Sequence, residues 1–109
     1  MTTPVLADSV TPFIKGDKMK DMNTNKLQEL RKQIDVLDEE LFCVLAQRFS
    51  TVTEVRKIKK VIGLAPLDEK RWESVVESRL AQAKALGLPA EFTKKLLELI
   101  HDRSLEIEG

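Results

Sequence analysis

The sequence of 109 residues has no tyrosine, one tryptophan and one cysteine, and only four glycines and four prolines. Its aromatic content of 5% disfavours a β-sandwich or barrel, whose strands are rich in such side chains. A single cysteine cannot form a disulfide within the chain, which fits a reducing compartment, so we expect a cytoplasmic protein. Few helix breakers in a chain rich in leucine, glutamate, lysine and alanine predict an all-α domain.

Neither sign of charge is in excess, because 18 basic and 18 acidic residues give a formal net charge of zero. Nucleic-acid-binding domains usually carry a basic excess, so this balance disfavours that class. Stretches without a charged residue, such as Leu41–Gln47, fall far short of the roughly 18 apolar residues that a membrane span needs. The N-terminus has no basic segment followed by an apolar stretch, so no secretory signal is predicted. We expect no nucleic-acid partner and no membrane association.

Residues 1–23 differ in composition from the rest of the chain. They hold two of the four prolines and Gly16, and they show no sustained periodicity. We interpret them as a flexible leader or as the remnant of a junction with another domain. Residues 24–109 are predicted to form one helical domain, since a chain of this size can bury one core but not two.

The first helix is predicted to be very long. Asn25 and Gln28 match a capping box, which predicts a helix start at Asn25. Neither glycine nor proline follows before Gly63, so the helix should continue to Ile62, over about 37 residues or roughly 55 Å. A globule formed by the rest of the chain should be only about 30–35 Å across. The helix is therefore longer than its own domain, and a partner chain is the simplest way to cover it.

Two shorter helices should follow. Asp68 is a good N-cap for the second helix, and Gly87 should end it. Pro89 is well placed as an early residue of the third helix, which should extend from about Ala90 to Glu108. The predicted buried faces consist of Trp72, Val75, Val76, Leu80 and Ala83 in the second helix, and of Phe92, Leu96, Leu97, Ile100 and Ile107 in the third.

Charged residues interrupt the apolar face of the first helix. Alternating steps of three and four residues select one face, as in a coiled coil. This face consists of Leu27, Arg31, Ile34, Asp38, Leu41, Leu45, Arg48, Val52, Val55, Lys59 and Ile62. One arginine or lysine on such a face often snorkels to solvent or pairs with an acid. Three need a further countercharge, because unpaired buried charges are costly, and a bound polyanion would supply it.

Helix geometry decides which of these cations can share a site. Arg48 and Lys59 are eleven residues apart, about 16 Å along the axis, so both can contact one small ligand. Arg31 lies seventeen residues before Arg48, about 25 Å away. It can therefore reach the same ligand only from a partner chain whose long helix runs antiparallel.

Polar residues at the ends of the shorter helices are weaker candidates for a site. Asp68 and Arg71 open the second helix, where backbone N–H groups favour an anion, although a cap and a surface cation are the simpler interpretation. Ser104 and Glu108 lie four residues apart on the last helix, and taken alone they form a solvated helix edge.

Other chemistry-bearing residues are isolated in the sequence. His101 has no partner at metal-ligand spacing, so we interpret it as a structural or surface residue and expect no metal site. Cys43 has no histidine partner and is interpreted as a small core residue. The absence of a glycine-rich phosphate loop disfavours a nucleotide-binding enzyme.

Over about residues 25–108 the chain resembles the all-helical AroQ-type chorismate mutases. The resemblance lies in the segments LQELRKQIDVLDEELFCVLAQRFSTVTEVRKIKK, PLDEKRW and GLPAEFTKKLLELIHDRSLEIE. Its specific features are an opening L-R-x-x-I-D-x-x-D-x-x-L, an A-x-R seventeen residues on, a lysine eleven residues later, and an I-H-x-x-S ending. In combination these features point to one family, whereas each alone is weak.

The resemblance implies a homodimer of intertwined three-helix chains, with two active sites that the partner's long helix completes. It also implies the rearrangement of chorismate to prephenate, a unimolecular step that needs no cofactor, metal or covalent intermediate. Arg31 from the partner and Arg48 would hold the two substrate carboxylates. Lys59 would donate to the ether oxygen, where negative charge grows as the C–O bond breaks.

The resemblance assigns further positions to the site. Asp68 and Arg71 match residues that line it, Asp68 near the substrate hydroxyl, and Ser104 matches a contact on the carboxylate side. Two positions depart from the common pattern: Trp72 stands where many relatives have glutamate, and Glu108 where many bacterial members have glutamine. An ionised carboxylate cannot donate a hydrogen bond, so Glu108 would act at the ether oxygen only in its protonated form.

Two other functions fit the same scaffold. An isochorismate-pyruvate lyase would use a similar set of cations, but the presence of both Asp68 and Arg71 favours the mutase. A regulatory module, fused to or associated with another enzyme of aromatic biosynthesis, would bind chorismate or prephenate without turnover, which Trp72 and Glu108 allow. A plain helical dimer without a ligand is the simplest alternative.

Overall fold

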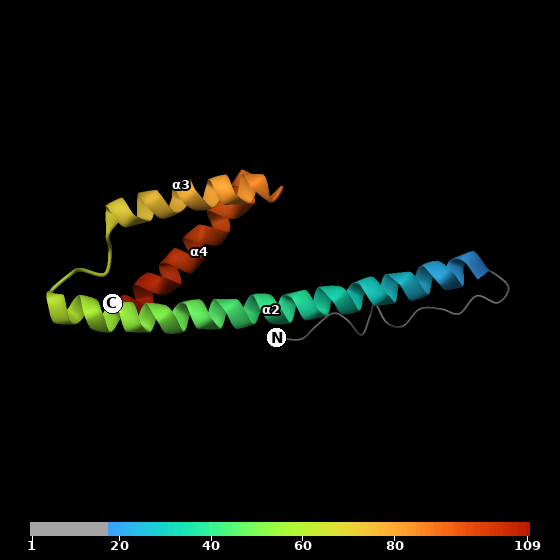
Figure 1. Cartoon of the computed structure of the whole chain (residues 1–109), viewed down its shortest axis with the longest axis horizontal. Helices are drawn as coiled ribbons and strands as arrows, with labels where there is room; N and C mark the ends of the chain where they lie inside the picture. Colours follow the sequence, from blue (N-terminus) through green and yellow to red (C-terminus); the bar gives the residue numbers. More distant parts are fainter. Residues whose placement is uncertain (1–17) are drawn as a thin grey trace. The chain divides into compact units, whose positions relative to one another are not determined.

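The computed structural model describes residues 18–109, which form three α-helices and no strand. Helix α2 spans Lys18–Ile62, α3 spans Glu69–Ala85 and α4 spans Ala90–Glu108 (Figure 1). This confirms the predicted all-α architecture of one very long helix followed by two shorter ones. Most of the predicted leader, residues 1–17, lies outside the described residues. None of the described helices is long and apolar enough to cross a membrane.

The predicted helix start at Asn25 is wrong, because α2 begins at Lys18. Residues 18–24 contain neither glycine nor proline, and their lysines and methionines are good helix formers. Helical hydrogen bonds that continue through Asn25 satisfy the same backbone N–H groups that a cap would satisfy. A local capping signal therefore does not end a helix whose preceding residues favour its continuation.

A glycine in the left-handed conformation ends α2. Gly63 has a φ of 75°, which a residue with a side chain adopts at a cost. The N–H of Leu64 donates to the carbonyl of Lys59 at 2.8 Å, which is the six-to-one hydrogen bond of a Schellman motif. The same turn follows α3, where Gly87 has a φ of 79°. Both predicted helix ends are confirmed.

The starts of the two shorter helices also follow local chemistry. Asp68 is the N-cap of α3, and its Oδ1 accepts a hydrogen bond from the N–H of Arg71 at 3.0 Å, as predicted. Pro89 is the N-cap of α4 rather than a residue within its first turn. Proline fits this position because it has no N–H that would need a partner.

Helices α3 and α4 pack against each other. On α3 the predicted face is confirmed, since Val75 and Ala83 are buried and the other predicted residues are partly buried. On α4 the prediction is partly wrong: Phe92 is 53% exposed and Leu96 38% exposed, although the other three predicted residues are partly buried.

The buried side of α4 centres instead on two hydroxyl-bearing residues, Thr93 and Ser104. The Thr93 hydroxyl donates to the carbonyl of Pro89 at 2.9 Å, and the Ser104 hydroxyl donates to that of Ile100 at 2.8 Å. Each hydroxyl is thus satisfied one turn earlier in the chain, so its burial leaves no polar group unpaired. Hydropathy alone would assign these small side chains to the surface.

Contacts within the chain divide it into two units, residues 1–44 and 45–109. The described part of the first unit is the N-terminal part of α2, a single helical segment without a core of its own. Its apolar residues Leu27, Ile34 and Leu41 are 43%, 54% and 54% exposed. Cys43 is also exposed, so its interpretation as a core residue is wrong.

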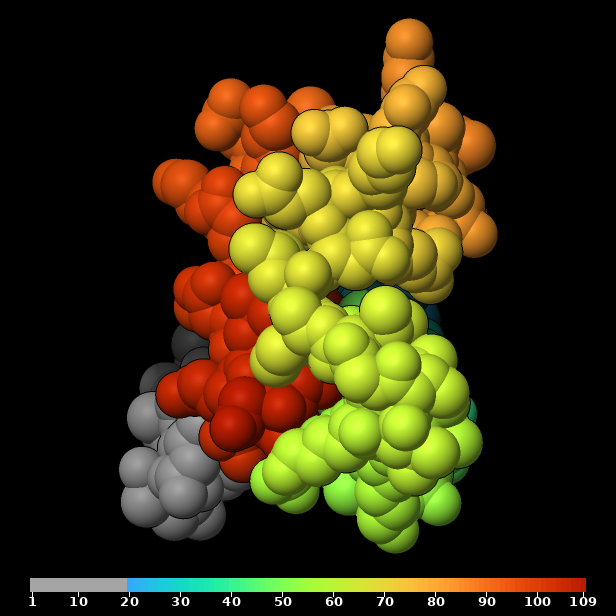
Figure 2. Space-filling model, turned by 90° about the vertical axis from the view of Figure 1, so that its left-hand side faces the viewer, coloured from blue at the N-terminus to red at the C-terminus, as the bar shows by residue number. Residues whose placement is uncertain are grey.

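The second unit contains the C-terminal part of α2, the following loop, α3 and α4. Helix α4 leads from the end of α3 back to the C-terminal part of α2 (Figure 1). The view onto the end of α2 shows the last turn of α4 beside the last turns of α2, with the loop to α3 above them (Figure 2). The chain's C-terminal residues therefore lie against α2 near its end, where the pocket described below is found.

Candidate active site

A pocket of about 200 Å³ lies in the second unit, between the C-terminal part of α2, the start of α3 and the second half of α4. Its charged and hydroxyl-bearing lining residues are Arg48, Lys59, Asp68, Arg71, Ser104 and Glu108. These are all of the site residues predicted from the sequence except Arg31, which belongs to the first unit. Arg48 and Lys59 thus line the same pocket.

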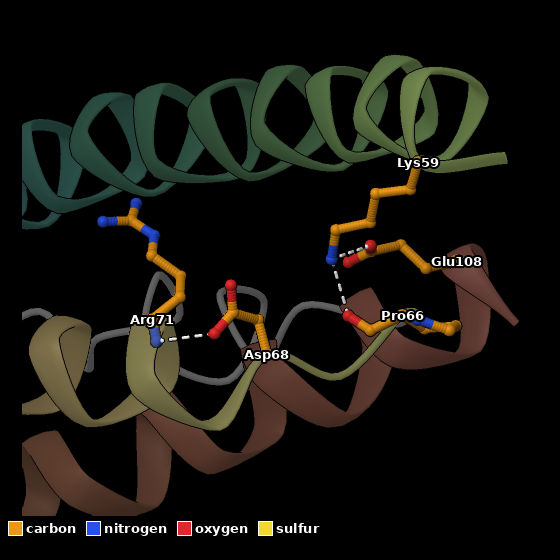
Figure 3. A network of polar contacts seen from close by, with 5 residues as sticks. All are labelled: Lys59, Pro66, Asp68, Arg71 and Glu108. Carbon is orange, nitrogen blue, oxygen red and sulfur yellow. Dashed lines mark hydrogen bonds and ion pairs between the residues drawn. The ribbon is translucent and has the colours of Figure 1, made fainter. Parts of the chain in front are cut away.

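Lys59 is held at the end of α2 by two oxygen atoms. Its Nζ lies 2.7 Å from Oε1 of Glu108 in an ion pair, and it donates to the carbonyl of Pro66 at 2.6 Å (Figure 3). The side chains of Lys59 and Glu108 are only 19% and 10% exposed. Because the backbone carbonyl of Lys59 also accepts from Leu64, this residue fixes the loop with both its main chain and its side chain.

Glu108 is part of an intact helix end. Helix α4 continues to this residue, and the N–H of Gly109 donates to the carbonyl of Leu105 at 2.8 Å. The interpretation of Ser104 and Glu108 as a solvated helix edge is therefore wrong, since Ser104 is 6% exposed and the Glu108 side chain is paired with Lys59. The ion pair joins residues far apart in the sequence, so no local pattern could reveal it.

Ser104 supports the guanidinium of Arg48. Nη1 of Arg48 donates to Oγ of Ser104 at 3.0 Å, and this hydroxyl in turn donates a hydrogen bond to the carbonyl of Ile100 at 2.8 Å. The chain of two hydrogen bonds connects α2 to α4 and orients one edge of the guanidinium. A planar group fixed in this way presents its remaining N–H donors in a defined direction, as recognition of a carboxylate requires.

The electrostatic environment of Arg48 is positive. Partial burial, and then the charges of Arg79 and Arg71, lower the pKa of the Arg48 guanidinium below its usual value. Among residues 18–109, no carboxylate forms an ion pair with any of these three arginines. An anion bound in the pocket would relieve this repulsion. The sequence analysis missed Arg79, although it follows Arg71 by two helical turns.

Asp68 and Arg71 have a role in the fold and also line the pocket. The carboxylate of Asp68 caps α3 through the N–H of Arg71, which confirms the simpler interpretation of Asp68. The side chain of Arg71 extends from α3 toward α2, and that of Lys59 extends from α2 into the space between these helices (Figure 3). The capping bond thus sets the direction of the first turn of α3 and places both side chains at the pocket.

Two aromatic rings form part of the pocket wall. Trp72 of α3 stacks on His101 of α4, with ring centroids 3.7 Å apart and planes inclined by 14°. This contact agrees with the structural interpretation of His101. Within residues 18–109, no three His, Cys, Asp or Glu side chains are grouped so that they could hold a metal ion.

Comparison with known protein families shows which family this chain belongs to. A model of the family described as chorismate mutase type II matches residues 30–109, which is most of the chain. The chain belongs to the chorismate mutase type II family. The resemblance inferred from the sequence motifs is confirmed. The matched residues include the parts of α2, α3 and α4 that line the pocket.

Sequence identity to curated proteins supports the same family assignment. The chain is 35% identical over 84 residues to a T-protein of Enterobacter agglomerans, covering 77% of this chain and 22% of that protein. It is 33% identical over 81 residues to a bifunctional chorismate mutase/prephenate dehydratase of Escherichia coli, covering 74% and 21%. The chain therefore spans about a fifth of the length of these relatives. No solved structure matches it significantly.

Proposed function

We propose that this domain catalyses the rearrangement of chorismate to prephenate. Chorismate carries two carboxylates and an ether bond that breaks as a new C–C bond forms. The observation that supports the proposal most directly is the pocket in which Arg48, Arg71 and Lys59 converge from two helices. Its positive field suits a dianion whose ether oxygen becomes more negative in the transition state. The Escherichia coli relative is named for the same activity, as a bifunctional chorismate mutase/prephenate dehydratase.

Each pocket residue has a role in this proposal. Arg48, oriented by Ser104, binds one carboxylate, and Arg71 adds positive charge at the same end. Lys59 has three N–H donors, of which Pro66 takes one, so another can reach the ether oxygen. Asp68 lies beside the substrate hydroxyl. The pocket lowers the barrier by holding a compact substrate conformer and by placing fixed charge where negative charge develops.

The proposal includes an antiparallel homodimer. The exposed apolar residues of the first part of α2, such as Leu27, Ile34 and Leu41, need a covering surface that this segment does not provide for itself. A second copy of the same helix supplies a matching apolar face. In that arrangement Arg31 of one chain reaches the pocket of the other and binds the second carboxylate. The pocket within one chain is then incomplete without its partner.

An assay with two substrates tests the proposed function. Purified full-length chain is incubated with chorismate and with isochorismate, and the products are separated and identified. We expect prephenate from chorismate without added metal or cofactor. Release of pyruvate from isochorismate without prephenate formation would instead show a lyase. Prephenate binding without turnover would show a regulatory module, and no thermal shift with any of these compounds would show a domain without this ligand class.

Glu108 should make turnover depend on pH. As the protonated acid it can donate to the ether oxygen beside Lys59, whereas the ionised carboxylate repels the charge that develops there. If the acid form is the active one, kcat/KM should fall as the pH of the assay is raised. Glu108→Gln carries a permanent amide donor, and it should flatten the profile and raise activity at neutral pH. Initial rates of both proteins between pH 5 and 8 measure this. Flat and equal profiles would contradict a role for Glu108.

A further inference from the structure

A second pocket, of about 230 Å³, also borders the residues of the Lys59–Glu108 ion pair. It shares Lys59, Pro66 and Glu108 with the first pocket, and it adds Arg56 and Lys60 from the last turns of α2. The carboxylate of Glu108 therefore borders two cavities. One contains the proposed substrate site, and the other contains two further cations.

Two atoms at the second pocket lack hydrogen bonds. Among residues 18–109, Nε of Arg56 and Oε1 of Glu108 are the buried side-chain polar atoms without a hydrogen-bond partner. Oε1 is nevertheless paired with Lys59 in the 2.7 Å ion pair, whereas Nε of Arg56 has no such partner. Buried donors are nearly always paired, so an unused donor at a cavity that Glu108 also lines indicates a second arrangement in which the carboxylate accepts from Arg56.

We propose that Arg56 is a positioning residue that receives the carboxylate of Glu108 when substrate occupies Lys59. The inference rests on the proposed function, because it is the substrate's ether oxygen that competes with Glu108 for Lys59. An ionised Glu108 left beside that oxygen would oppose the developing negative charge. Moving to the second pocket, it would meet a cation whose forked N–H groups match a carboxylate, with Lys60 adjacent.

The contacts of Lys59 make this exchange feasible. Its hydrogen bond to Pro66 does not involve Glu108, so Nζ stays in place when the ion pair opens. A carboxylate that lost Lys59 and found no other cation would be buried with an unpaired charge, which is costly. Arg56 lines the same cavity as Glu108, so a rotation of the Glu108 side chain toward it would remove that cost. This exchange transfers no proton and breaks no covalent bond.

The inference is tested by a double-mutant cycle on chorismate turnover by the full-length chain. Arg56→Gln removes the receiving cation and should lower kcat about tenfold with little change in KM. In the Glu108→Gln background there is no carboxylate to receive, so the same Arg56→Gln change should leave kcat unaltered. Lys57→Gln removes an equal charge one residue along α2, where the side chain is 68% exposed and outside both pockets, and it should alter neither background.

The outcomes separate this inference from the proposed function. Equal loss in both backgrounds would show that Arg56 acts independently of Glu108, and unchanged kcat in Arg56→Gln would also overturn the inference. An increase in kcat would overturn it as well. Absence of prephenate formation by the unmodified chain would instead refute the proposed function and this inference together. Circular dichroism confirms that each variant remains helical.

Discussion

Replacement of Arg48 by alanine should reduce chorismate turnover by about 100- to 1000-fold while leaving the helices folded. Arg48 lies in the pocket and donates to Ser104, yet it makes no ion pair with an acid of the described chain. In the proposed site, its loss would remove a charged contact to the substrate carboxylate and to the transition state. That loss corresponds to about 3–4 kcal/mol in the activation barrier.

The structure explains why the same substitution should spare the fold. The Ser104 hydroxyl keeps its hydrogen bond to the carbonyl of Ile100, so no buried polar group is left unpaired. Removing Arg48 also relieves its repulsion with Arg79 and Arg71. Arg103→Ala is the matched control, because Arg103 is 59% exposed and pairs with Glu106 away from the pocket. Near-normal kcat/KM in Arg48→Ala would remove the basis for the proposed substrate site.

A mixture of two inactive homodimers should regain about a quarter of normal activity if Arg31 acts in the partner's site. Arg31→Ala and Arg48→Ala each inactivate both sites of their own homodimers. After the chains are mixed and re-annealed, about half of the dimers contain one chain of each kind. Such a dimer has one site with both arginines and one site with neither. Turnover per total chain, measured after subunit exchange, gives the recovery.

The matched control mixes Arg48→Ala with Arg71→Ala. Both residues line the pocket of a single chain, so every site in the mixed dimer lacks one of them and activity should stay low. Recovery that is confined to the pair containing Arg31 would separate the partner's contribution from any general effect of mixing. If exchange is verified and the Arg31 pair stays inactive, then Arg31 does not complete the partner's site.

Much of the secondary structure could be predicted from residues that act on their immediate neighbours. Gly63 and Gly87 adopt left-handed conformations that end helices, and Asp68 caps α3 with its own side chain. The start of α2 was missed because the capping signal at Asn25 competes with helix-forming residues on both sides. Local signals therefore predict strong helix ends well, and they predict weak ones poorly.

The pocket was predicted less completely than the helices. Spacing along α2 predicted that Arg48 and Lys59 can reach one ligand, and the two residues line one pocket, since a straight helix fixes their separation. The burial of Ser104 was not predicted, because it depends on the rotation of α4 against its neighbours. The contribution of Arg79 to the field at Arg48 likewise requires the fold to bring α3 to the same pocket as α2. Arg56 was not singled out, because its significance appears only where two pockets meet.

The sequence alone determined the helical class, the ends of α3 and α4 and the family, because each depends on residue type and on spacing along one chain. Only the tertiary structure decided which charges meet. Lys59 and Glu108 approach to 2.7 Å, and Trp72 stacks on His101, because α4 returns to the end of α2 beside α3. Coulombic and hydrogen-bond energies fall steeply with distance and angle. The partners of a buried charge are therefore set by helix packing, which spacing along the sequence does not specify.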